Sequence, residues 1–459
     1  MYAGHPPVRR SIMSEATLHR RALLRQTAAL GTATLSGPLV LTAGSPNAKL
    51  GVAVIACGGM GGGNPGVAAS EHCVALCDVD DRKMAEAVSK IKDKVPNPRT
   101  YFDYRKMYDE CAKDIDVVLI ATPDHHHAPA AMRAIRLGKH VFCQKPLAHN
   151  VAEVHALMKA AREKKVLTAM GNQGHYGEPI RRACEYLWAG AIGAVRETHT
   201  ILGRDFGGSG GRPPSKPVPE GLHWDEWLGP AEFRDYHDGL HPFSWRSWRA
   251  FGTGTIGDMA CHNLDALFSA LKIAEAKRFS VTCIAQKGGS DEMYPQSNAL
   301  LWEIPERAGM PPVNVHVYDN RGVMSDAMKE AERALNVKFG ECTLFVGDTG
   351  YFRTKGTCGG AEILPAEKMK EFPEPPKTLT RAHGGPVTDL LWAIKNNGPA
   401  CSNFPDEAGP LTAFQLTGHL AMFAGVGRKV EWDVEKAECT NIPEVNQFAR
   451  RTYRKGWEL

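Results

Sequence analysis

The feature that most constrains the fold of this chain is a short apolar run that leads into a cluster of glycines and then into a helical pattern. The apolar run covers residues 50–55, the glycines extend from Gly58 to Gly63, and the helical pattern ends near Ser70. Downstream, short runs typical of strands alternate with amphipathic stretches typical of helices as far as residue 170. Because such alternating elements are joined by right-handed crossovers, the pattern predicts an α/β fold built on a doubly wound parallel sheet. Further strands are expected at 74–77, 117–121, 140–143 and 166–170, and helices at 82–92, 129–137 and 154–164.

The composition and the periodicity of the sequence change after residue 171. Trp, Pro and Gly become more frequent, and residues 203–256 show no regular period. Strand-like runs then follow one another without regular crossover helices, which predicts a large, open and mostly antiparallel second sheet. We therefore expect three parts: an N-terminal segment over 1–48, a doubly wound domain over 49–170, and a C-terminal α/β domain over 171–459. The C-terminal strands are expected at 279–285, 299–302, 313–318 and 343–346, and the last helices at 387–396 and 408–424.

The N-terminal segment resembles a twin-arginine export signal. Arg20 and Arg21 precede an uncharged run of small and apolar residues over 27–43, which is followed by Gly, Ser and Pro. The run is too short and too rich in Gly, Thr and Ser for a membrane-spanning helix, which needs about 20 strongly apolar residues. We therefore expect a periplasmic or otherwise exported protein without membrane integration. The alternative is a basic tail that carries no export signal.

Charge and cysteine usage narrow the functional classes. The net charge of +4 is carried by residues 1–48, where five Arg face a single acid, so the rest of the chain has equal numbers of basic and acidic residues. This balance argues against a surface for nucleic acid or for an anionic membrane. The twelve cysteines include no Cys-x-x-Cys pair and mostly lie in apolar runs, so we expect buried thiols. Such thiols suit a protein that folds in the reducing cytoplasm before export.

The glycine turn is a candidate phosphate cradle, because backbone N–H groups at the start of a helix can approach a pyrophosphate closely there. Ala56 replaces the first glycine of the G-x-G-x-x-G pattern, and any tight turn would also use glycines. Asp78 follows Gly58 by twenty positions and ends the next strand, where an acid can accept hydrogen bonds from ribose hydroxyls. The acid favours NAD over NADP; the alternative is that Asp78 and Asp80 merely cap the next helix. The candidate cofactor residues of the turn are Gly58, Gly59, Met60 and Gly61.

A second group of polar residues follows two neighbouring strands. Thr122, Pro123 and three consecutive histidines centred on His126 come after one strand, and Gln144 and Lys145 come after the next. Ligands gather at the carboxyl ends of such strands, so this group is expected to line the nicotinamide side of a cleft. Adjacent histidines in a turn diverge and no further ligand spacing accompanies them, so we expect no metal site.

A third group lies in the irregular part of the chain. If a helix begins at Asp258, then Asp258, His262 and Asp265 share one face at positions i, i+4 and i+7. Two acids and an imidazole would then be placed to take a proton from a hydroxyl while hydride leaves its carbon. The alternative is a capped helix with a hydrogen-bonded structural histidine.

Together, the glycine turn, Gln-Lys-Pro after a strand, and Gly-Asp-x-x-x-His-x-x-Asp resemble the glucose-fructose oxidoreductase, inositol dehydrogenase and rhizopine-catabolism (Gfo/Idh/MocA) family over roughly residues 49–430. The resemblance implies an N-terminal Rossmann domain and a C-terminal α/β domain whose open sheet mediates homo-oligomerisation. It also implies Lys145 as the catalytic lysine, His262 as the acid/base, and Asp258 as the residue that orients the substrate hydroxyl and the imidazole. Gln144 stands where the family commonly has Glu.

Two further sets of residues are expected near the same cleft. Asn172, Gln173 and His175 follow a strand end and are expected to reach it, Asn172 as a cofactor contact. Aromatic and basic side chains also crowd the irregular region, where aromatic faces can stack on a pyranose and Arg can bind its hydroxyls or a carboxylate. The alternative is that these aromatics pin a long connection to the core. They are Trp224, Trp227, His241, Trp245, Arg246, Trp248 and Arg249.

These expectations lead to an NAD-dependent oxidoreductase that acts on a CH–OH carbon of a small sugar or sugar derivative. Outside the cytoplasm free NAD is scarce, so an exported enzyme of this kind would need a retained cofactor. The same residues would also serve an NAD-dependent glycosidase that works by transient oxidation and elimination. A third alternative is a non-catalytic sugar or dinucleotide binder on the same fold.

Overall fold

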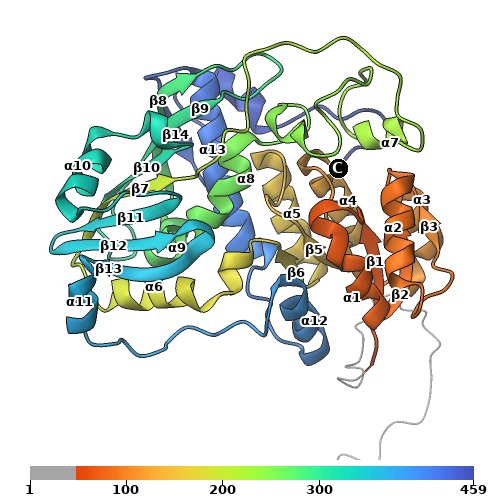
Figure 1. Ribbon diagram of the computed structural model, residues 1–459, viewed down its shortest axis with the longest axis horizontal. Helices are drawn as coiled ribbons and strands as arrows, with labels where there is room; N and C mark the ends of the chain where they lie inside the picture. The colour runs from red at the N-terminus through yellow and green to blue at the C-terminus, as the bar shows by residue number, and fades with distance from the viewer. Residues whose placement is uncertain (1–47) are drawn as a thin grey trace, which may run out of the picture. The chain divides into compact units, whose positions relative to one another are not determined.

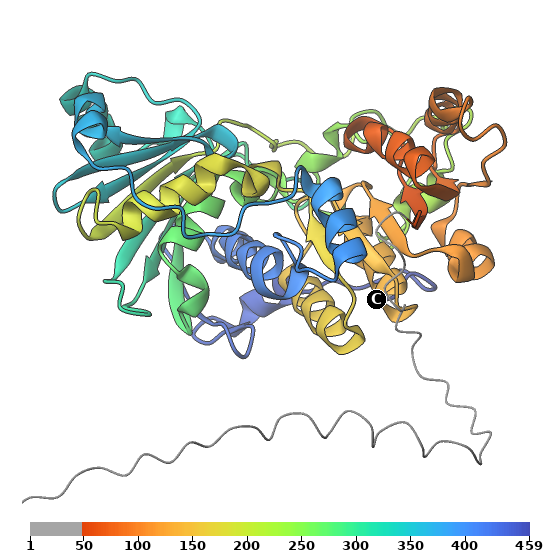
Figure 2. The same ribbon diagram turned by 90° about the horizontal axis from the view of Figure 1, so that it is seen from below.

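The computed structural model describes residues 48–459, which form two β-sheets with helices packed against each (Figure 1, Figure 2). The predicted export signal falls on residues 1–47, outside the described part of the chain. Within the described part, no helix is both long enough and apolar enough to span a membrane. All twelve cysteines lie in this part; they are free, and ten of them are buried, as the sequence indicated.

The first sheet has six strands in the order β3-β2-β1-β4-β5-β6, and all of its pairs are parallel. The strand order reverses between β1 and β4, and open sheets of this kind bind ligands beside the carboxyl ends of the strands at that point. The predicted doubly wound parallel sheet is therefore confirmed. Its strands are β1 (Gly51–Ile55), β2 (His72–Cys77), β3 (Thr100–Tyr101), β4 (Val117–Ile120), β5 (His140–Cys143) and β6 (Thr168–Met170).

Helices cover both faces of this sheet. On one face, α1 (Asn64–Ser70), α2 (Asp81–Ile91) and α12 (Pro386–Asn396) share a buried cluster with the strands. The opposite face belongs to a second cluster, to which the helices α3 (Tyr104–Cys111), α4 (Asp124–Arg136) and α5 (Val151–Lys164) contribute. The helix α12 comes from the part of the sequence assigned to the C-terminal domain. The chain therefore does not divide at a single point near residue 170, because its late segment returns to the first sheet.

The second sheet has nine strands in the order β13-β12-β11-β7-β10-β9-β8-β14-β15. All its pairs are antiparallel except β7 with β10, which confirms the mostly antiparallel C-terminal sheet. Its strands are β7 (Val195–Ile201), β8 (Arg278–Lys287), β9 (Ser297–Ile304), β10 (Val313–Tyr318), β11 (Cys342–Gly347), β12 (Gly350–Lys355), β13 (Gly359–Leu364), β14 (Lys429–Asp433) and β15 (Glu438–Cys439).

The two faces of the second sheet are covered differently. One face joins the large core through α6 (Glu178–Trp188), α9 (Asp265–Ala270) and α13 (Gly409–Ala424). The other face packs against α10 (Asp326–Leu335) at one end only. The remaining helices are α7 (Trp224–Leu228), α8 (Gly254–Asn263) and α11 (Ala366–Glu371).

The irregular segment between β7 and α8 has a small core of its own. Trp224, Trp227, Trp245 and Trp248 are all buried there, together with Phe251. Burial of several large aromatic rings holds a long segment in place although it has little regular hydrogen bonding. All four tryptophans therefore pack as the alternative describes, by pinning the connection to a core.

The start of α4 differs from the sequence expectation. The helix begins at Asp124 rather than at Pro129, so the three histidines form its first turn and Pro129 lies inside it. Proline favours the first position of a helix, which is why the pattern suggested a start there. The tertiary structure supports the earlier turn, because the backbone N–H of His125 donates to Phe251 O at 3.1 Å.

A buried carboxylate ties the segment between α11 and α12 to α6. Glu185 accepts hydrogen bonds from the backbone N–H groups of Thr378 and Leu379 and from the side chains of Arg182 and Arg381. The hydrogen bonds from Arg381 are the largest influence, and they help to lower the pKa of Glu185 to about 2. This site therefore anchors the segment that carries α12 back to the first sheet.

We predict that Glu185→Gln lowers the free energy of unfolding by about 3 kcal/mol at pH 7, because it leaves buried cations without their partner. The folded-state pKa lies below the unfolded value of about 4.3, so the stabilisation is present above that pH and is lost as the pH falls toward 2. Urea unfolding of both proteins across this pH range should show the difference shrinking. Glu178→Gln, which also loses Arg381 but lies at the surface, serves as the control, with an expected effect under about 1 kcal/mol. An equal loss in the two variants would contradict the anchoring role.

Candidate functional site

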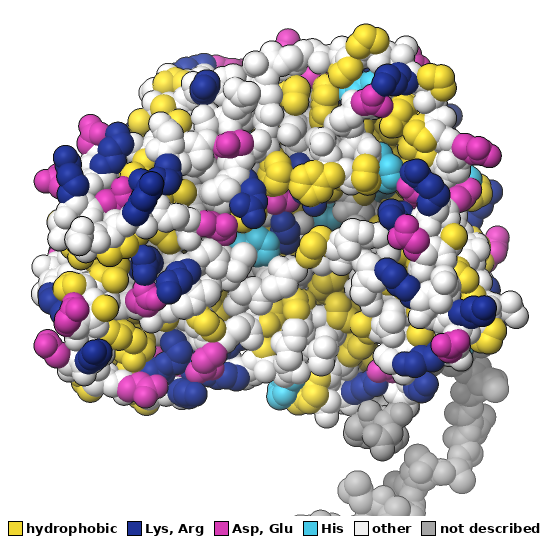
Figure 3. All heavy atoms as spheres, in the orientation of Figure 1, with side chains coloured by type: hydrophobic (Ala, Val, Ile, Leu, Met, Phe, Trp, Pro, Cys, Tyr) yellow, Lys and Arg dark blue, Asp and Glu magenta, His cyan; other side chains and the backbone are white. Residues whose placement is uncertain are grey.

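A cavity of about 350 Å³ lies where the glycine turn, the carboxyl ends of the first-sheet strands and the irregular segment meet. In the space-filling view, histidine, basic and acidic side chains gather near the middle of the face shown (Figure 3). Most of the predicted cofactor residues line this cavity. They are Gly58, Gly59, Met60, Asp78, Thr122, Pro123, His126, Gln144 and Lys145.

The glycine turn has the close packing that a phosphate cradle needs. A Cβ atom on Gly61 would lie 2.2 Å from Ala56 O, so no larger residue fits at that position. Gly59 has a φ of 50° and nothing within 4 Å of where its Cβ would be, which leaves the backbone open toward the cavity. Ala56, at the position of the usual first glycine, also has a positive φ of 66°. The turn therefore keeps the glycine-type backbone there at some conformational cost to an alanine.

Asp78 directly follows β2, and its carboxylate faces the turn. Its two oxygens accept hydrogen bonds from the backbone N–H groups of Cys57 at 2.7 Å and Asp80 at 2.9 Å. Burial raises the pKa of Asp78, and these two hydrogen bonds oppose the shift. Asp80, by contrast, accepts from the N–H of Arg82 and caps α2. The capping alternative therefore applies to Asp80, while Asp78 lines the cavity.

These residues fit the adenosine half of NAD. Each oxygen of Asp78 has a lone pair left beyond its backbone partner, so the carboxylate can accept from ribose hydroxyls. Gly59 leaves its backbone open to an approaching pyrophosphate, and Gly61 allows the turn to pack closely against Ala56.

Lys145 and Asp258 form the centre of the site. Lys145 Nζ lies 3.0 Å from Asp258 Oδ1 and also donates to the backbone carbonyl of Asp258 at 2.9 Å. Arg246 Nε donates to the same carboxylate oxygen at 3.0 Å. Burial alone would raise the pKa of Asp258, but the charges of Lys145 and Arg246 outweigh it and keep this pKa below its usual value. Asp258 thus stays ionised and fixes two cations at the end of the cavity.

His262 lies one turn after Asp258 on α8 and is 5% exposed. Burial, reinforced by the charge of Lys145, lowers its pKa to about 3, while Asp258 acts in the opposite direction. Its Nδ1 atom is buried without a hydrogen-bond partner among the described residues. The imidazole is therefore neutral at pH 7 and can accept a proton. It is not one of the residues that line the cavity in this structure.

The expectation that Asp258, His262 and Asp265 share one face of a helix beginning at Asp258 is wrong in two respects. The helix α8 begins at Gly254, four residues before Asp258, and it ends before Asp265. Asp265 starts α9, and its carboxylate contacts Asn172 Nδ2 at 2.8 Å and His175 Nδ1 at 3.0 Å. A bend between the two helices separates the two acids, so that of Asp258 and Asp265 only Asp258 forms an ion pair with Lys145. No hydrogen bond joins Asp258 to His262 in the described structure, where Lys145 and Arg246 both contact Oδ1 of the carboxylate.

Asn172, predicted to contact the cofactor, does not line the cavity. It is fully buried, donates to Asp265 and accepts a hydrogen bond from Ser402 Oγ at 2.8 Å. His175 joins the same network, in which the charge of Asp265 raises its pKa against the effect of burial. These residues follow β6 as expected, but they support α9 from behind the site and do not line the cavity.

The three histidines of α4 have structural partners. His125 Nε2 and His126 Nε2 lie 3.0 Å and 2.9 Å from Trp227 O, and His127 contacts the carbonyls of Thr122 and Pro146. Burial lowers the pKa of His126 to about 3, so it is neutral. His125 and His126 fasten the irregular segment to α4, whereas His127 ties α4 to the turns after β4 and β5. Of the three, His126 alone lines the cavity.

The irregular segment forms one wall of the cavity. Of the residues named from the sequence, Trp227, His241, Trp245 and Arg246 line it, whereas Trp224, Trp248 and Arg249 do not. The Arg246 guanidinium lies over the rings of Phe243 and Trp245, at 4.4 Å and 4.3 Å from their centroids. Sequence reasoning missed several lining residues, because they come from segments without a motif. Among them are Phe102, Asp103, Tyr104, Glu226, Phe243 and Trp457.

Asp124 was also missed. It lies at the start of α4, lines the cavity and accepts a hydrogen bond from Thr253 Oγ1 at 2.6 Å. Burial raises its pKa to about 7, which makes it a second group that can exchange a proton near neutral pH. Its position directly after Thr122-Pro123 at a strand end was the signal that could have identified it.

Residues 50–172 match the family model described as an oxidoreductase family with an NAD-binding Rossmann fold, and residues 205–294 match the model of that family's C-terminal alpha/beta domain. A levoglucosan dehydrogenase of Pseudarthrobacter phenanthrenivorans is 29% identical over 164 residues, which cover 36% of this chain and 34% of that protein. An alpha-N-acetylgalactosaminidase of Shewanella oneidensis is 31% identical over 134 residues, which cover 25% of this chain and 29% of that protein. These matches thus span about a third of the relatives' length.

Solved structures show the same fold at low sequence identity. The aldose-aldose oxidoreductase from Caulobacter crescentus complexed with glycerol has a TM-score of 0.52 and 18% identity, covering 83% of this chain and 99% of that one. GenD2 from gentamicin A biosynthesis in complex with NAD has a TM-score of 0.54 and 17% identity, covering 86% and 100%. The geometry of the site is consistent with these matches. The glycine turn with Asp78 lies in the first matched region, and the Lys145–Asp258 pair joins the first matched region to the second. Residues 50–172 and 205–294 thus match the two domain models of the Gfo/Idh/MocA oxidoreductase family, and the first of these regions is an NAD-binding Rossmann domain.

Proposed function

We propose that this protein oxidises a CH–OH carbon of a sugar or sugar derivative with NAD. The observation that carries the proposal is the Lys145–Asp258–Arg246 cluster, which stands at the end of the cofactor cavity beside a neutral histidine. Bound NAD would accept the hydride that leaves the carbinol carbon. The protein must then hold the hydroxyl and remove its proton.

Each residue of the cluster has a separate task in this proposal. Asp258 holds the ammonium of Lys145 at the cavity wall, where it can donate a hydrogen bond to the substrate oxygen and stabilise negative charge on it. His262, neutral at pH 7, accepts the hydroxyl proton. Burial of the cluster strengthens these interactions, because little water screens them.

The cavity wall supports a sugar as the substrate. Trp227, Phe243 and Trp245 offer aromatic surface, and Arg246 lies against two of these rings with its guanidinium held in place by Asp258. An aromatic ring next to hydrogen-bonding groups suits a pyranose, which has an apolar face and polar edges. The relative named levoglucosan dehydrogenase is consistent with this substrate class.

We further propose that the protein is exported, retains its NAD and works as a homo-oligomer through the second sheet. An exported enzyme cannot rely on cytoplasmic NAD, so a bound cofactor would have to be reoxidised in place by a second substrate. The paired arginines near the N-terminus support export, and the partly uncovered face of the second sheet supports association. Light scattering of the purified protein tests the oligomer.

A redox-neutral glycosidase is the second candidate. The match to an alpha-N-acetylgalactosaminidase favours it, and the same Lys145 and His262 would serve transient oxidation, elimination and reversal. An assay that follows both NADH absorbance and release of the glycosidic group separates the two candidates. Net NADH formation identifies the oxidoreductase, whereas glycoside cleavage without net NADH identifies the glycosidase.

The first prediction from this proposed function concerns the cofactor. Protein purified without added nucleotide and then denatured should release close to one NAD per chain, because the cavity offers a dinucleotide lining residues from both the first sheet and the irregular segment. Chromatography with absorbance detection measures the released nucleotide. An empty protein would contradict a retained cofactor and would favour a dehydrogenase with exchangeable NAD.

The second prediction concerns proton transfer. His262→Asn should lower kcat by about 10²–10⁴-fold while the NAD content stays the same, because the variant removes the base and leaves the glycine turn intact. His155→Asn on α5, a half-buried histidine outside the cavity, is the matched control and should keep full activity. Unchanged turnover of the His262 variant would refute its role, and a non-catalytic binder would show no turnover in any variant.

The third prediction concerns the ribose contact. Asp78→Asn keeps an acceptor for the Cys57 N–H but loses the charge, so the Kd for NAD should rise about tenfold and the preference over NADP should shrink. Fluorescence titration of nucleotide-free protein with NAD and NADP measures both constants. Asp93→Asn, exposed in the turn after α2, should change neither. Equal affinities in the Asp78 variant and the unmodified protein would show that this carboxylate does not contact the ribose.

A further inference from the structure

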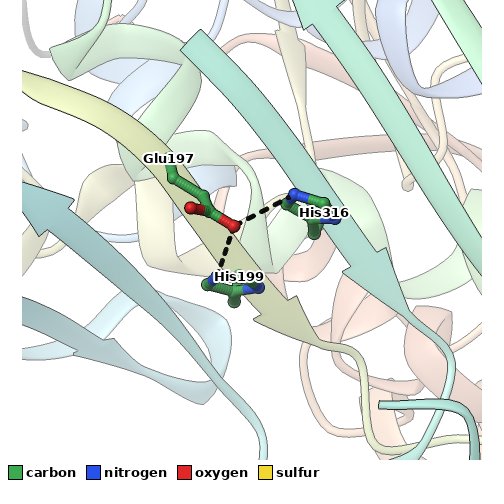
Figure 4. A group of neighbouring side chains, drawn as sticks. All are labelled: Glu197, His199 and His316. Carbon is green, nitrogen blue, oxygen red and sulfur yellow. Dashed lines mark ion pairs between the residues drawn. The ribbon is translucent and has the colours of Figure 1, made fainter. Parts of the chain in front are cut away.

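We propose that Glu197, His199 and His316 bind one divalent transition-metal ion such as Zn²⁺. The three side chains come from the neighbouring strands β7 and β10 of the second sheet and converge on one point (Figure 4). None of them lines the cofactor cavity. No sequence motif marks this site, because His316 follows Glu197 and His199 by more than a hundred positions in the chain.

The register of the two strands brings the ligands together. His199 lies directly opposite His316 in the parallel pair, and Glu197 precedes His199 by two residues on β7. Residues two apart in a strand, and residues directly paired between strands, point to the same face of a sheet. All three side chains therefore project from one face, and their ligand atoms lie within 4.8 Å of one another.

The two distances from the histidine nitrogens to Glu197 match a tetrahedral site. His199 Nε2 and His316 Nε2 lie 3.1 Å and 3.2 Å from the same oxygen, Glu197 Oε1. With Zn–N and Zn–O bonds of about 2.0–2.1 Å, two ligand atoms at a tetrahedral angle lie about 3.3 Å apart. An ion can therefore be placed between these three atoms with small side-chain adjustments.

A hydrogen bond behind His199 favours the tautomer that a metal needs. The Tyr318 hydroxyl donates to Ser325 Oγ at 2.7 Å, so it accepts at 2.9 Å from the Nδ1–H of His199. The Nε2 atom of a neutral His199 then carries a lone pair and faces Glu197. A lone pair that faces a carboxylate is repulsive, and a metal cation between the two atoms removes that repulsion. Metal-binding histidines commonly donate their other N–H to an oxygen in this way.

The histidine pair points to the same conclusion. The rings of His199 and His316 are stacked with centroids 4.8 Å apart, and both direct Nε2 toward Glu197. One cation placed between the two Nε2 atoms and the carboxylate would contact all three side chains at once.

The donor set selects the class of ion. Two imidazoles and one carboxylate suit Zn²⁺ and its first-row neighbours, while Mg²⁺ and Ca²⁺ prefer oxygen ligands throughout. The Glu197 side chain is 37% exposed and that of His316 is 21% exposed, so a fourth position opens on the surface of the single chain, where water can complete the coordination. The ion would fasten β7 to β10, the only parallel pair of the described second sheet.

The site is independent of the cofactor cavity. The opposite face of the same strands carries Thr200, which contacts Thr343, and Thr343 donates to the backbone carbonyl of Asn263 at the end of α8. The metal side chains therefore lie across the sheet from the helix that holds Asp258. A variant of the metal site can be tested with NAD content as an independent measure of correct folding.

The experiment uses the full chain, treated with a chelator, dialysed and titrated with Co²⁺ as a spectroscopic substitute for Zn²⁺. We expect one Co²⁺ per chain with the strong visible absorption of a four-coordinate ion, and a rise in Tm with Zn²⁺. Both signals should disappear in His316→Gln and Glu197→Gln. His72→Gln, an exposed histidine on β2, is the control for nonspecific histidine binding and should behave like the unmodified protein.

Tyr318→Phe adds a test of the tautomer argument. It keeps all three ligands but removes the acceptor for His199 Nδ1–H, so the Kd for Co²⁺ should rise about 10–100-fold. The proposal is overturned if the unmodified protein binds no stoichiometric Co²⁺. It is equally overturned if His316→Gln, shown to be folded by its NAD content and circular dichroism, binds Co²⁺ as tightly as the unmodified protein.

Discussion

The buried carboxylate of Asp258 is the interaction on which the site depends. It binds Lys145, which follows a strand of the first sheet, and Arg246, which belongs to the irregular segment, while Asp258 itself lies on α8. A buried charge without partners is strongly destabilising, so the three segments must come together for the carboxylate to be accommodated. Asp258 thereby joins the three segments at the end of the cavity and fixes Lys145, which the proposed chemistry requires.

The irregular segment has two roles that the sequence could not separate. Its buried tryptophans form a small core and fasten it to α4 through contacts with His125 and His126. The same segment supplies Trp227 and Arg246 to the cavity wall. Packing and substrate contact are compatible here, because a ring can be buried on one side and border a cavity on the other.

The second sheet separates two environments. One face joins the large core and supports α8, through the link from Thr343 to Asn263. The other face is only partly covered by α10 and carries the cluster of Glu197, His199 and His316. Because side chains alternate between the faces of a strand, a single strand, β7, contributes to both environments.

The sequence by itself determined the doubly wound first sheet, the mostly antiparallel second sheet and the residues of the glycine turn, because these follow from local periodicity and from backbone requirements at single positions. It also identified Lys145, Asp258 and His262 through motifs. Only the tertiary structure decided which side chains meet. Asp265 and Asn172 turned out to support the site from behind, since a bend between α8 and α9 directs Asp265 away from Lys145. Asp124, α12 and the metal cluster depend on contacts between residues distant in the chain, which periodicity does not encode.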